Sequence, residues 1–229
     1  MKFNEQIFNI FKSFFTEKGY PESKYLPHNG ALDYYKKDKN NIHWIRITLD
    51  ITKKAFVDVY GQISFLEVTN ILQKFLEIRT DYTEEIVVNY YLYENREKWT
   101  DIWKALQAAS PLKTKEDIEI FKQNISNHVD TYIVPFFEKI PNLQAVNDEI
   151  LNKLSFDEYP NFIPGNCTLK VLIIMKLCEN TKYEDYKTLK LLAYKKNTET
   201  DYKNWIEDYE TLQSLITYLD SGEYKKDLI

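Results

Sequence analysis

The stretch Ile42–Gly61 constrains the fold more than any other part of the chain. Apolar and polar side chains alternate along residues 44–51, and the alternation resumes at residues 55–60 after two lysines. A period of two is typical of a strand with one buried face, so two such runs joined by a short polar turn predict a β-hairpin. In the second run the expected faces are Ala55, Val57 and Val59 on one side and Phe56, Asp58 and Tyr60 on the other.

Two further runs extend the hairpin into a sheet. Residues 31–37 predict a strand before it, and residues 86–93 predict a fourth strand after a helix. The second face of this sheet is expected to carry the aromatic and basic residues Tyr35, Trp44, Arg46, Tyr91 and Tyr93. Large aromatic and arginine side chains are typical of binding surfaces, so these five are the candidate binding residues. The alternative is that later helices cover this face.

Helical periodicity accounts for most of the remaining chain. An aromatic amphipathic helix is expected over residues 3–18, and the pattern is helical throughout from residue 98 onward. Ser64 and Glu67 have the spacing of a capping box, while Pro135 should kink or restart the helix that contains it. The sequence therefore predicts an α+β fold, with a mainly antiparallel sheet of about four strands in residues 1–97 and a larger helical part in residues 98–229.

Composition places the chain among ordinary globular proteins. It has 229 residues, 44% of them hydrophobic and 28% charged, which is enough to build a core without a disulfide or a metal. The two cysteines, Cys167 and Cys178, would lie too far apart on one helix to form a bridge. Unpaired thiols, together with the absence of any apolar run of membrane-spanning length, predict a cytoplasmic protein that does not enter a membrane.

Charge is distributed unevenly along the chain. Residues 1–113 contain 16 basic and 15 acidic side chains, giving +1, while residues 114–229 contain 14 and 20, giving −6. There is no basic surplus to release counterions from a phosphate backbone, so nucleic-acid binding is disfavoured. The acidic part suits either a basic protein partner or simply a solvated surface.

Motifs that would identify an enzyme are missing from the sequence. The five glycines form no phosphate-binding loop, and no zinc-ligand spacing occurs, so no catalytic residue, metal or cofactor is assigned. A site assembled from dispersed residues would have to use Cys167, His128 or Arg46. Cys167 is expected at a loop-to-helix junction, where a helix N-terminus can lower a thiol pKa, but a small, partly buried residue is the simpler interpretation.

Several segments together resemble known proteins. They are the aromatic N-terminal helix, the strand ending in Tyr34-Tyr35-Lys36, the hairpin at residues 45–60, the segment YIVPFFEKI at residues 132–140, and the closing helix with Leu191-Leu192-Ala193-Tyr194. This order is similar to that of bacterial α+β proteins grouped as domains of unknown function. Some related groups are regarded as immunity proteins for secreted toxins. The resemblance implies a small α+β protein and carries no catalytic residue across.

Two functional hypotheses follow from these observations. The first is a cytoplasmic protein-binding module, such as an immunity protein that blocks a basic toxin domain through its acidic helices or its aromatic sheet face. The second is an enzyme or small-ligand binder whose site is assembled from dispersed residues. Binding is favoured because a catalytic site usually leaves a local signature, and the sequence contains none.

Overall fold

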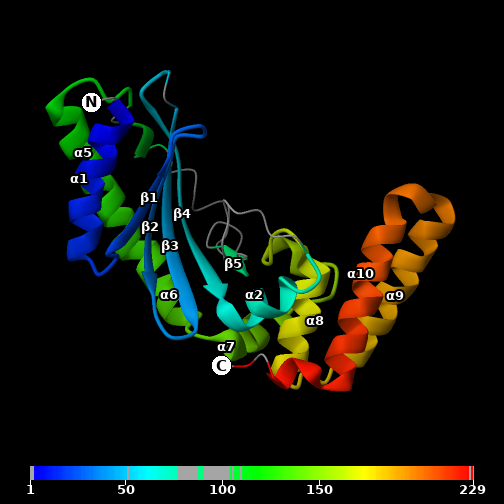
Figure 1. Ribbon diagram of the computed structural model, residues 1–229. Coiled ribbons are helices and arrows are strands. Elements are labelled where there is room, and N and C mark those ends of the chain that lie inside the picture. The colour runs from blue at the N-terminus through cyan, green and yellow to red at the C-terminus, as the bar shows by residue number, and fades with distance from the viewer. Residues whose placement is uncertain are drawn as a thin grey trace. The chain divides into compact units, whose positions relative to one another are not determined.

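The computed structural model describes residues 3–50, 52–76, 87–89, 104, 106–108, 110–226 and 228. Two compact units interleave along the chain (Figure 1). Unit 1 comprises residues 1–63 and 89–140, and unit 2 comprises residues 64–88 and 141–229. The sequence pattern predicts a boundary between residues 97 and 98. Each of the two units contains residues from both sides of that point.

A five-stranded sheet with the order β1-β2-β3-β4-β5 begins in unit 1. Its strands are β1 (Glu22–Leu26), β2 (Ala31–Lys37), β3 (Asn41–Asp50), β4 (Ala55–Phe65) and β5 (Val88–Asn89). The first three strands pair antiparallel, with Tyr25 opposite Leu32 and Tyr34 opposite Ile45. The predicted hairpin is β3–β4, so the α+β class and the antiparallel sheet in the N-terminal half are confirmed. Of the predicted fourth strand, the structure describes only residues 87–89.

Strand β1 was not predicted from the sequence. Its five residues, ESKYL, carry no apolar alternation, and Pro21 and Pro27 bracket them as they would bracket a loop. The strand lies at the edge of the sheet, where it pairs on one side with β2 alone. An edge strand buries less side-chain surface than a central one, so it leaves a weaker hydrophobic pattern.

Helix α1 (Phe3–Glu17) packs on one face of the sheet, which we call the helix face. The phenyl ring of Phe15 stacks on Tyr34 of β2 with 4.5 Å between ring centroids, and the Tyr34 hydroxyl donates to the Phe8 carbonyl at 3.1 Å. The fully buried side chains of α1 are Ile7, Phe11 and Phe15. Burying each phenylalanine contributes about 2 kcal/mol, so these rings hold the helix on the sheet.

Side chains along β4 do not alternate regularly between the two faces of the sheet from residue 56 to residue 61. The Phe56 ring contacts Phe121 on the helix face, with centroids 5.6 Å apart. The Cα of Gly61 also faces the helices, because a Cβ built there would lie 2.6 Å from a methyl of Ile133 and 3.1 Å from Phe137. Residues five apart in a regular strand lie on opposite faces, so an irregularity such as a β-bulge must separate these two.

This irregularity overturns one prediction about the hairpin. Val57 and Val59 were expected to share a face, but Val57 is 44% exposed whereas Val59 is fully buried. A one-residue slip moves every later side chain to the other face of the sheet. Sequence alternation alone therefore placed the start of β4 on the wrong side.

The other helices of unit 1 follow one another without a loop. They are α5 (Lys115–His128), the π-helical turn η1 (Val129–Ile133) and α6 (Val134–Lys139), which lie with α1 on the helix face (Figure 1). Thr114 caps α5 by accepting from the Asp117 N–H at 3.0 Å. Pro135 has no N–H to offer the Thr131 carbonyl, so the hydrogen bonding shifts to π spacing, where the Val134 N–H donates to Val129. The sequence predicted a kink or restart at Pro135; the helical path continues through it, and the boundary between η1 and α6 lies one residue before it.

Unit 2 is helical apart from the end of β4. Its elements are α2 (Leu66–Leu72), α7 (Leu143–Val146), η2 (Asn147–Leu151), η3 (Tyr159–Asn161), α8 (Cys167–Leu177), α9 (Tyr183–Thr200), α10 (Tyr202–Ser221) and η4 (Glu223–Lys226). The last three long helices agree with the predicted ones. The predicted capping box at Ser64 and Glu67 was wrong. Ser64 belongs to β4, its hydroxyl makes no hydrogen bond to any described residue, and Phe65 precedes the helix.

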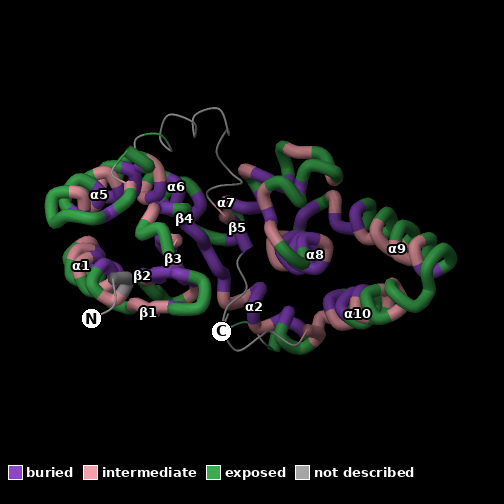
Figure 2. Tube along the Cα trace, turned by 90° about the horizontal axis from the view of Figure 1, so that it is seen from above, coloured by how far each residue is buried: buried purple, intermediate pink, exposed green. Residues whose placement is uncertain are grey.

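Helix α8 is the centre of unit 2. Eight of its eleven side chains are buried. The C-terminal half of α9 and the N-terminal half of α10 are mostly exposed (Figure 2). Charged groups join the three helices at their base, where Asp220 accepts from Lys176 at 2.9 Å, Lys187 at 3.0 Å and the Tyr183 hydroxyl at 3.0 Å. Burial acts to raise the pKa of Asp220, but these three donors outweigh it and the pKa is lowered.

Gly61→Ala tests the close approach of β4 to η1. The new methyl would collide with Ile133, so we expect the free energy of unfolding to fall by about 1–3 kcal/mol. Urea denaturation of Gly61→Ala, Ile133→Ala and the double variant measures this. Because Ile133→Ala removes the colliding methyl, the double variant should lose less than the sum of the two single costs. Simple additivity would contradict the proposed collision.

Candidate functional site

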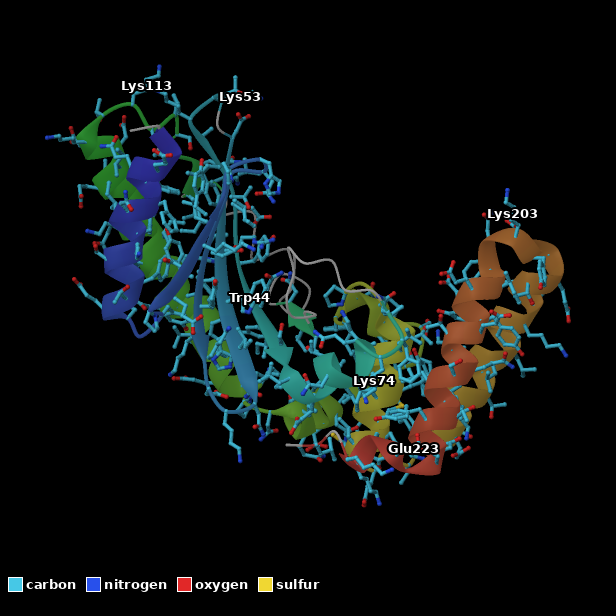
Figure 3. All side chains as sticks on the ribbon, viewed as in Figure 1. Trp44, Lys53, Lys74, Lys113, Lys203 and Glu223 are labelled. Carbon is cyan, nitrogen blue, oxygen red and sulfur yellow. The ribbon has the colours of Figure 1, made fainter. Side chains whose placement is uncertain are left out.

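The face of the sheet opposite the helix face carries a cluster of polar and aromatic side chains. The register places Tyr35 opposite Trp44 and Asp33 opposite Arg46, and alternation puts all four on this second face. The rings of Tyr35 and Trp44 lie 5.8 Å apart. Figure 3 labels Trp44 on the side of the sheet away from α1. The sequence therefore placed these side chains on the correct face.

A buried ion pair occupies the centre of this face. Arg46 donates from Nε and Nη2 to the two carboxylate oxygens of Asp33, with both distances 2.6 Å. The two residues are only 6% and 2% exposed. Burial acts to lower the pKa of Arg46, but the hydrogen bonds and charge of Asp33 outweigh it and raise the pKa. Arg46 also hydrogen-bonds Tyr60, so the pair links β2, β3 and β4.

Asp58 lies on the same face of β4 as Tyr60, two residues away. Its Oδ1 is buried and has no hydrogen-bond partner among the described residues. Burial raises the pKa of Asp58 to about 6, although the Val59 N–H partly opposes the shift. A carboxyl group with such a pKa changes charge near neutral pH, and groups of this kind concentrate at functional sites.

Further polar atoms of this face are buried without hydrogen bonds inside the described part of the chain. They include the indole Nε1 of Trp44 and the amide Oε1 of Gln62. Trp44 is 6% exposed and Gln62 is 4% exposed. Buried polar atoms almost always have a partner, so each exception needs an explanation.

The structure thus groups three of the five predicted binding residues, Tyr35, Trp44 and Arg46. The other two, Tyr91 and Tyr93, lie outside the described residues. Trp44 and Arg46 are both buried. An open binding platform would leave these side chains exposed, whereas a covered face would bury them. Sequence reasoning missed the polar members of the cluster, Asp33, Asp58, Tyr60 and Gln62. The available signal was the charged residue Asp33 between the apolar and aromatic residues of a strand.

The dispersed catalytic candidates do not assemble within unit 1. His128 belongs to α5, which packs on the helix face, whereas Arg46 points to the second face. Burial lowers the pKa of His128 to about 4, so its ring is neutral at physiological pH. His43, whose ring stacks on Phe137 at 4.7 Å, also has a pKa lowered by burial, and its Nε2 makes no hydrogen bond in the described structure.

Cys167 belongs to unit 2, where it opens α8 as the sequence predicted. The thiol pKa is not lowered by the helix N-terminus, and the preferred interpretation of Cys167 as a small buried residue agrees with its 9% exposure. Burial raises the pKa to about 11, more than the charges of Lys190 and Lys170 can offset. A thiol with this pKa is almost entirely protonated at neutral pH and is a poor nucleophile. Both cysteines are free, in agreement with the sequence-based expectation for Cys167 and Cys178.

The α9–α10 hairpin provides a second candidate surface, which we call the arm and define as residues 189–210. Leu189, Leu192 and Tyr202 are 47%, 62% and 65% exposed. Among the described residues, the other large apolar side chains with exposure above 40% are Val57, Ile120 and Leu228. The rings of Tyr194 and Trp205 contact at 5.6 Å and join the two helices. Exposed apolar side chains gathered on one element commonly mark an interaction surface.

Acidic side chains lie at the same level of the arm as the leucines. Because the Tyr194–Trp205 contact aligns two antiparallel helices, Leu192 lies level with Glu207, and residue 189 lies level with residue 210. Glu207, Asp208 and Glu210 are all exposed. The arm as a whole contains five acidic and four basic side chains, a net charge of −1, so its negative charge is local to α10.

Comparisons with known proteins do not assign either surface. No family model, no curated protein and no solved structure matches the chain. Within the described ranges, no group of three or more His, Cys, Asp or Glu side chains is arranged to hold a metal ion. None of the described helices combines the length and the apolar character needed to cross a bilayer.

Replacing Arg46 tests the buried ion pair. Arg46→Met leaves the Asp33 carboxylate buried without its cation, and we expect a loss of about 3–5 kcal/mol in the free energy of unfolding. In the Asp33→Leu/Arg46→Met double variant both charges are absent, so most of this loss should be recovered. Chemical denaturation checks both values. Equal losses in the single and double variants would contradict the assignment of the cost to an unpaired charge.

Asp58 predicts a pH dependence of stability. The pKa is about 6 in the folded protein and 3.8 ordinarily, so the folded state binds the proton more tightly. The contribution of Asp58 to stability is therefore most favourable below about pH 4, becomes less favourable as pH rises to about 6, and then stays constant. Asp58→Asn should abolish this fall and stabilise the protein at pH 7–8 by about 1–2 kcal/mol, a value reduced for partial exposure.

A matched control for Asp58 is available in the same hairpin. Asp50 accepts from the N–H groups of Thr52 and Lys53 at 2.9 Å, and these bonds lower its pKa. Asp50→Asn should therefore change neutral-pH stability in the opposite direction to Asp58→Asn. Urea denaturation between pH 3 and pH 8 compares them. An unchanged pH profile in Asp58→Asn would show that Asp58 does not titrate in this range.

Proposed function

We propose that this chain is a protein-binding module that recognises a basic partner through its arm. The observation that carries the proposal is the exposure of Leu189, Leu192 and Tyr202 on a hairpin whose base is tied to a buried helix. Interfaces commonly combine a few apolar anchors with a polar rim. The arm offers both on ordered helices, so little conformational entropy would be lost on binding.

Charge indicates the kind of partner. The exposed Glu207, Asp208 and Glu210 give the start of α10 a local negative charge, and residues 114–229 as a whole carry −6. Complementary charge speeds association and discriminates against acidic competitors. A basic protein surface with apolar side chains that contact the leucines would fit this arrangement.

We further propose that the partner is a basic toxin domain, which would make this chain an immunity protein. The support is the net charge of −6 on residues 114–229 together with the sequence resemblance to immunity-protein-like α+β proteins. Such a function requires no catalytic residue, and the high thiol pKa of Cys167 agrees with a binding role. The genomic neighbour provides the first partner to test, provided that it encodes a secreted multidomain toxin.

Binding of the purified basic domain encoded next to this gene tests the proposal. We expect Leu192→Asp to weaken the complex by about tenfold or more, because burying the new carboxylate removes an apolar contact and adds a desolvation cost. Glu207→Lys should weaken it chiefly by slowing association, and this effect should shrink as salt is raised. Isothermal titration and stopped-flow kinetics measure these changes.

Residue 120 supplies a matched control. Ile120 on α5 is as exposed as Leu189, both at 47%, but it lies outside the arm. Ile120→Asp should leave affinity unchanged, whereas Leu189→Asp should reduce it. If both substitutions have the same effect, or if the neighbouring domain does not bind at all, the arm is not the recognition surface for this partner.

A further inference from the structure

The turn that joins β1 to β2 contains the single Asn-Gly pair of the sequence, Asn29-Gly30. The turn lies between Leu26 and Ala31, and the Asn29 N–H donates to the Leu26 carbonyl at 3.4 Å. Gly30 has a φ of +68°, a left-handed conformation that glycine adopts without steric cost. Asn29 is therefore held in a tight hairpin turn and is followed directly by a glycine.

The side chain of Asn29 folds over the backbone that follows it. Its Oδ1 accepts from the Ala31 N–H at 3.1 Å, which makes an Asx turn. An Asx turn imitates a backbone β-turn, with the side-chain carbon Cγ in the place of a backbone carbonyl carbon. This geometry brings Cγ close to the backbone nitrogen of Gly30. Within the described residues, the Gly30 N–H donates to no acceptor.

The turn favours attack of the Gly30 nitrogen on Asn29 Cγ. Gly30 has no side chain to obstruct the approach. The Ala31 N–H polarises the side-chain carbonyl of Asn29 and stabilises the negative charge that develops on Oδ1 during the attack. Asn29 is exposed to water, although Gly30 itself is buried. Because the two reacting groups belong to neighbouring residues of one ordered turn, little conformational freedom is lost when they react.

We propose that Asn29 is a site of spontaneous deamidation in the folded protein. The Gly30 nitrogen gives up its proton to water and forms a bond to Asn29 Cγ. The bond from Cγ to Nδ2 breaks, and Nδ2 takes up a proton and leaves as ammonia, so that a succinimide ring remains. One water molecule then opens the ring at either of its two carbonyl groups. The product is aspartate or isoaspartate at position 29, and water is the only co-reactant.

Deamidation changes the turn in charge and in length. The neutral carboxamide becomes a carboxylate, which takes the net charge of the chain from −5 to −6. In isoaspartate the main chain runs through Cβ and Cγ, so the turn beside the edge strand β1 becomes longer by one backbone atom. The site does not involve the arm, so it stands or falls separately from the proposed protein-binding function.

Peptide mapping by mass spectrometry, after incubation of the full chain at pH 8, tests the site. The peptide that contains Asn29 should be replaced by two heavier products, in which a hydroxyl stands in place of the amino group. These are the aspartate and isoaspartate forms, which have the same mass and are separated by chromatography. Direct hydrolysis of the side chain would give aspartate alone, so the isoaspartate form shows that the reaction passes through the ring.

Asn127 provides a matched control in the same sample. It is also exposed, but it lies in α5, where helical hydrogen bonding engages the N–H of the next residue. Its Oδ1 accepts from Gln123 Nε2 at 2.8 Å. Asn127 should therefore remain unmodified while Asn29 is converted. Asn29→Gln should abolish the change at position 29, because cyclisation of glutamine requires a larger ring and is much slower.

The contribution of the turn is measured by repeating the incubation in guanidinium chloride, where the Asn-Gly pair is present without the fold. We expect the folded protein to convert Asn29 at least as fast as the unfolded chain, because the turn already holds the reacting groups together. Slower conversion in the folded protein would show that the turn protects Asn29 and would overturn the proposal. Equal conversion of Asn29 and Asn127 in the folded protein would also overturn it.

Discussion

The buried Arg46–Asp33 pair is the interaction on which the sheet of unit 1 depends. Two charges that are almost completely removed from water must stay together, since separating them would leave each uncompensated. Their bidentate geometry fixes Asp33 of β2 opposite Arg46 of β3, and a slip of one residue would carry Arg46 to the helix face among the phenylalanines. The pair therefore determines which side chains each face of the sheet presents.

The two faces are stabilised by different physical effects. On the helix face, burial of apolar side chains dominates. Gly61 has no side chain at the point where η1 lies close to β4, and next to Pro135 the helix has π-type hydrogen bonding. On the second face, polar groups are buried at a cost and require specific partners. Close packing thus specifies one side of the sheet, and hydrogen bonding specifies the other.

Sequence reasoning succeeded where a periodic pattern reflects burial. It recovered the β3–β4 hairpin and α1, which each bury one face, and the last three helices, whose apolar residues recur at helical spacing. It failed where the decisive contact is distant in sequence. The slip within β4 depends on packing against α5 and η1, and the strand β1 depends on pairing with β2. For Cys167, burial sets the thiol pKa, as the favoured interpretation of a small, partly buried residue implies.

The same limit applies to the candidate sites. Tyr35, Trp44 and Arg46 could be placed on one face by alternation. Only the three-dimensional structure shows that Trp44 Nε1 and Gln62 Oε1 are buried without a hydrogen bond to a described residue. The arm shows the opposite situation, because its exposed leucines lie on helices that the sequence predicted correctly. Its base is held by Asp220 and the lysines around it, while its outer half contributes little to the core of unit 2. Because the side chains there are mostly exposed, we expect substitutions to change the free energy of unfolding little, so this surface can vary over evolutionary time without putting the rest of the protein at risk.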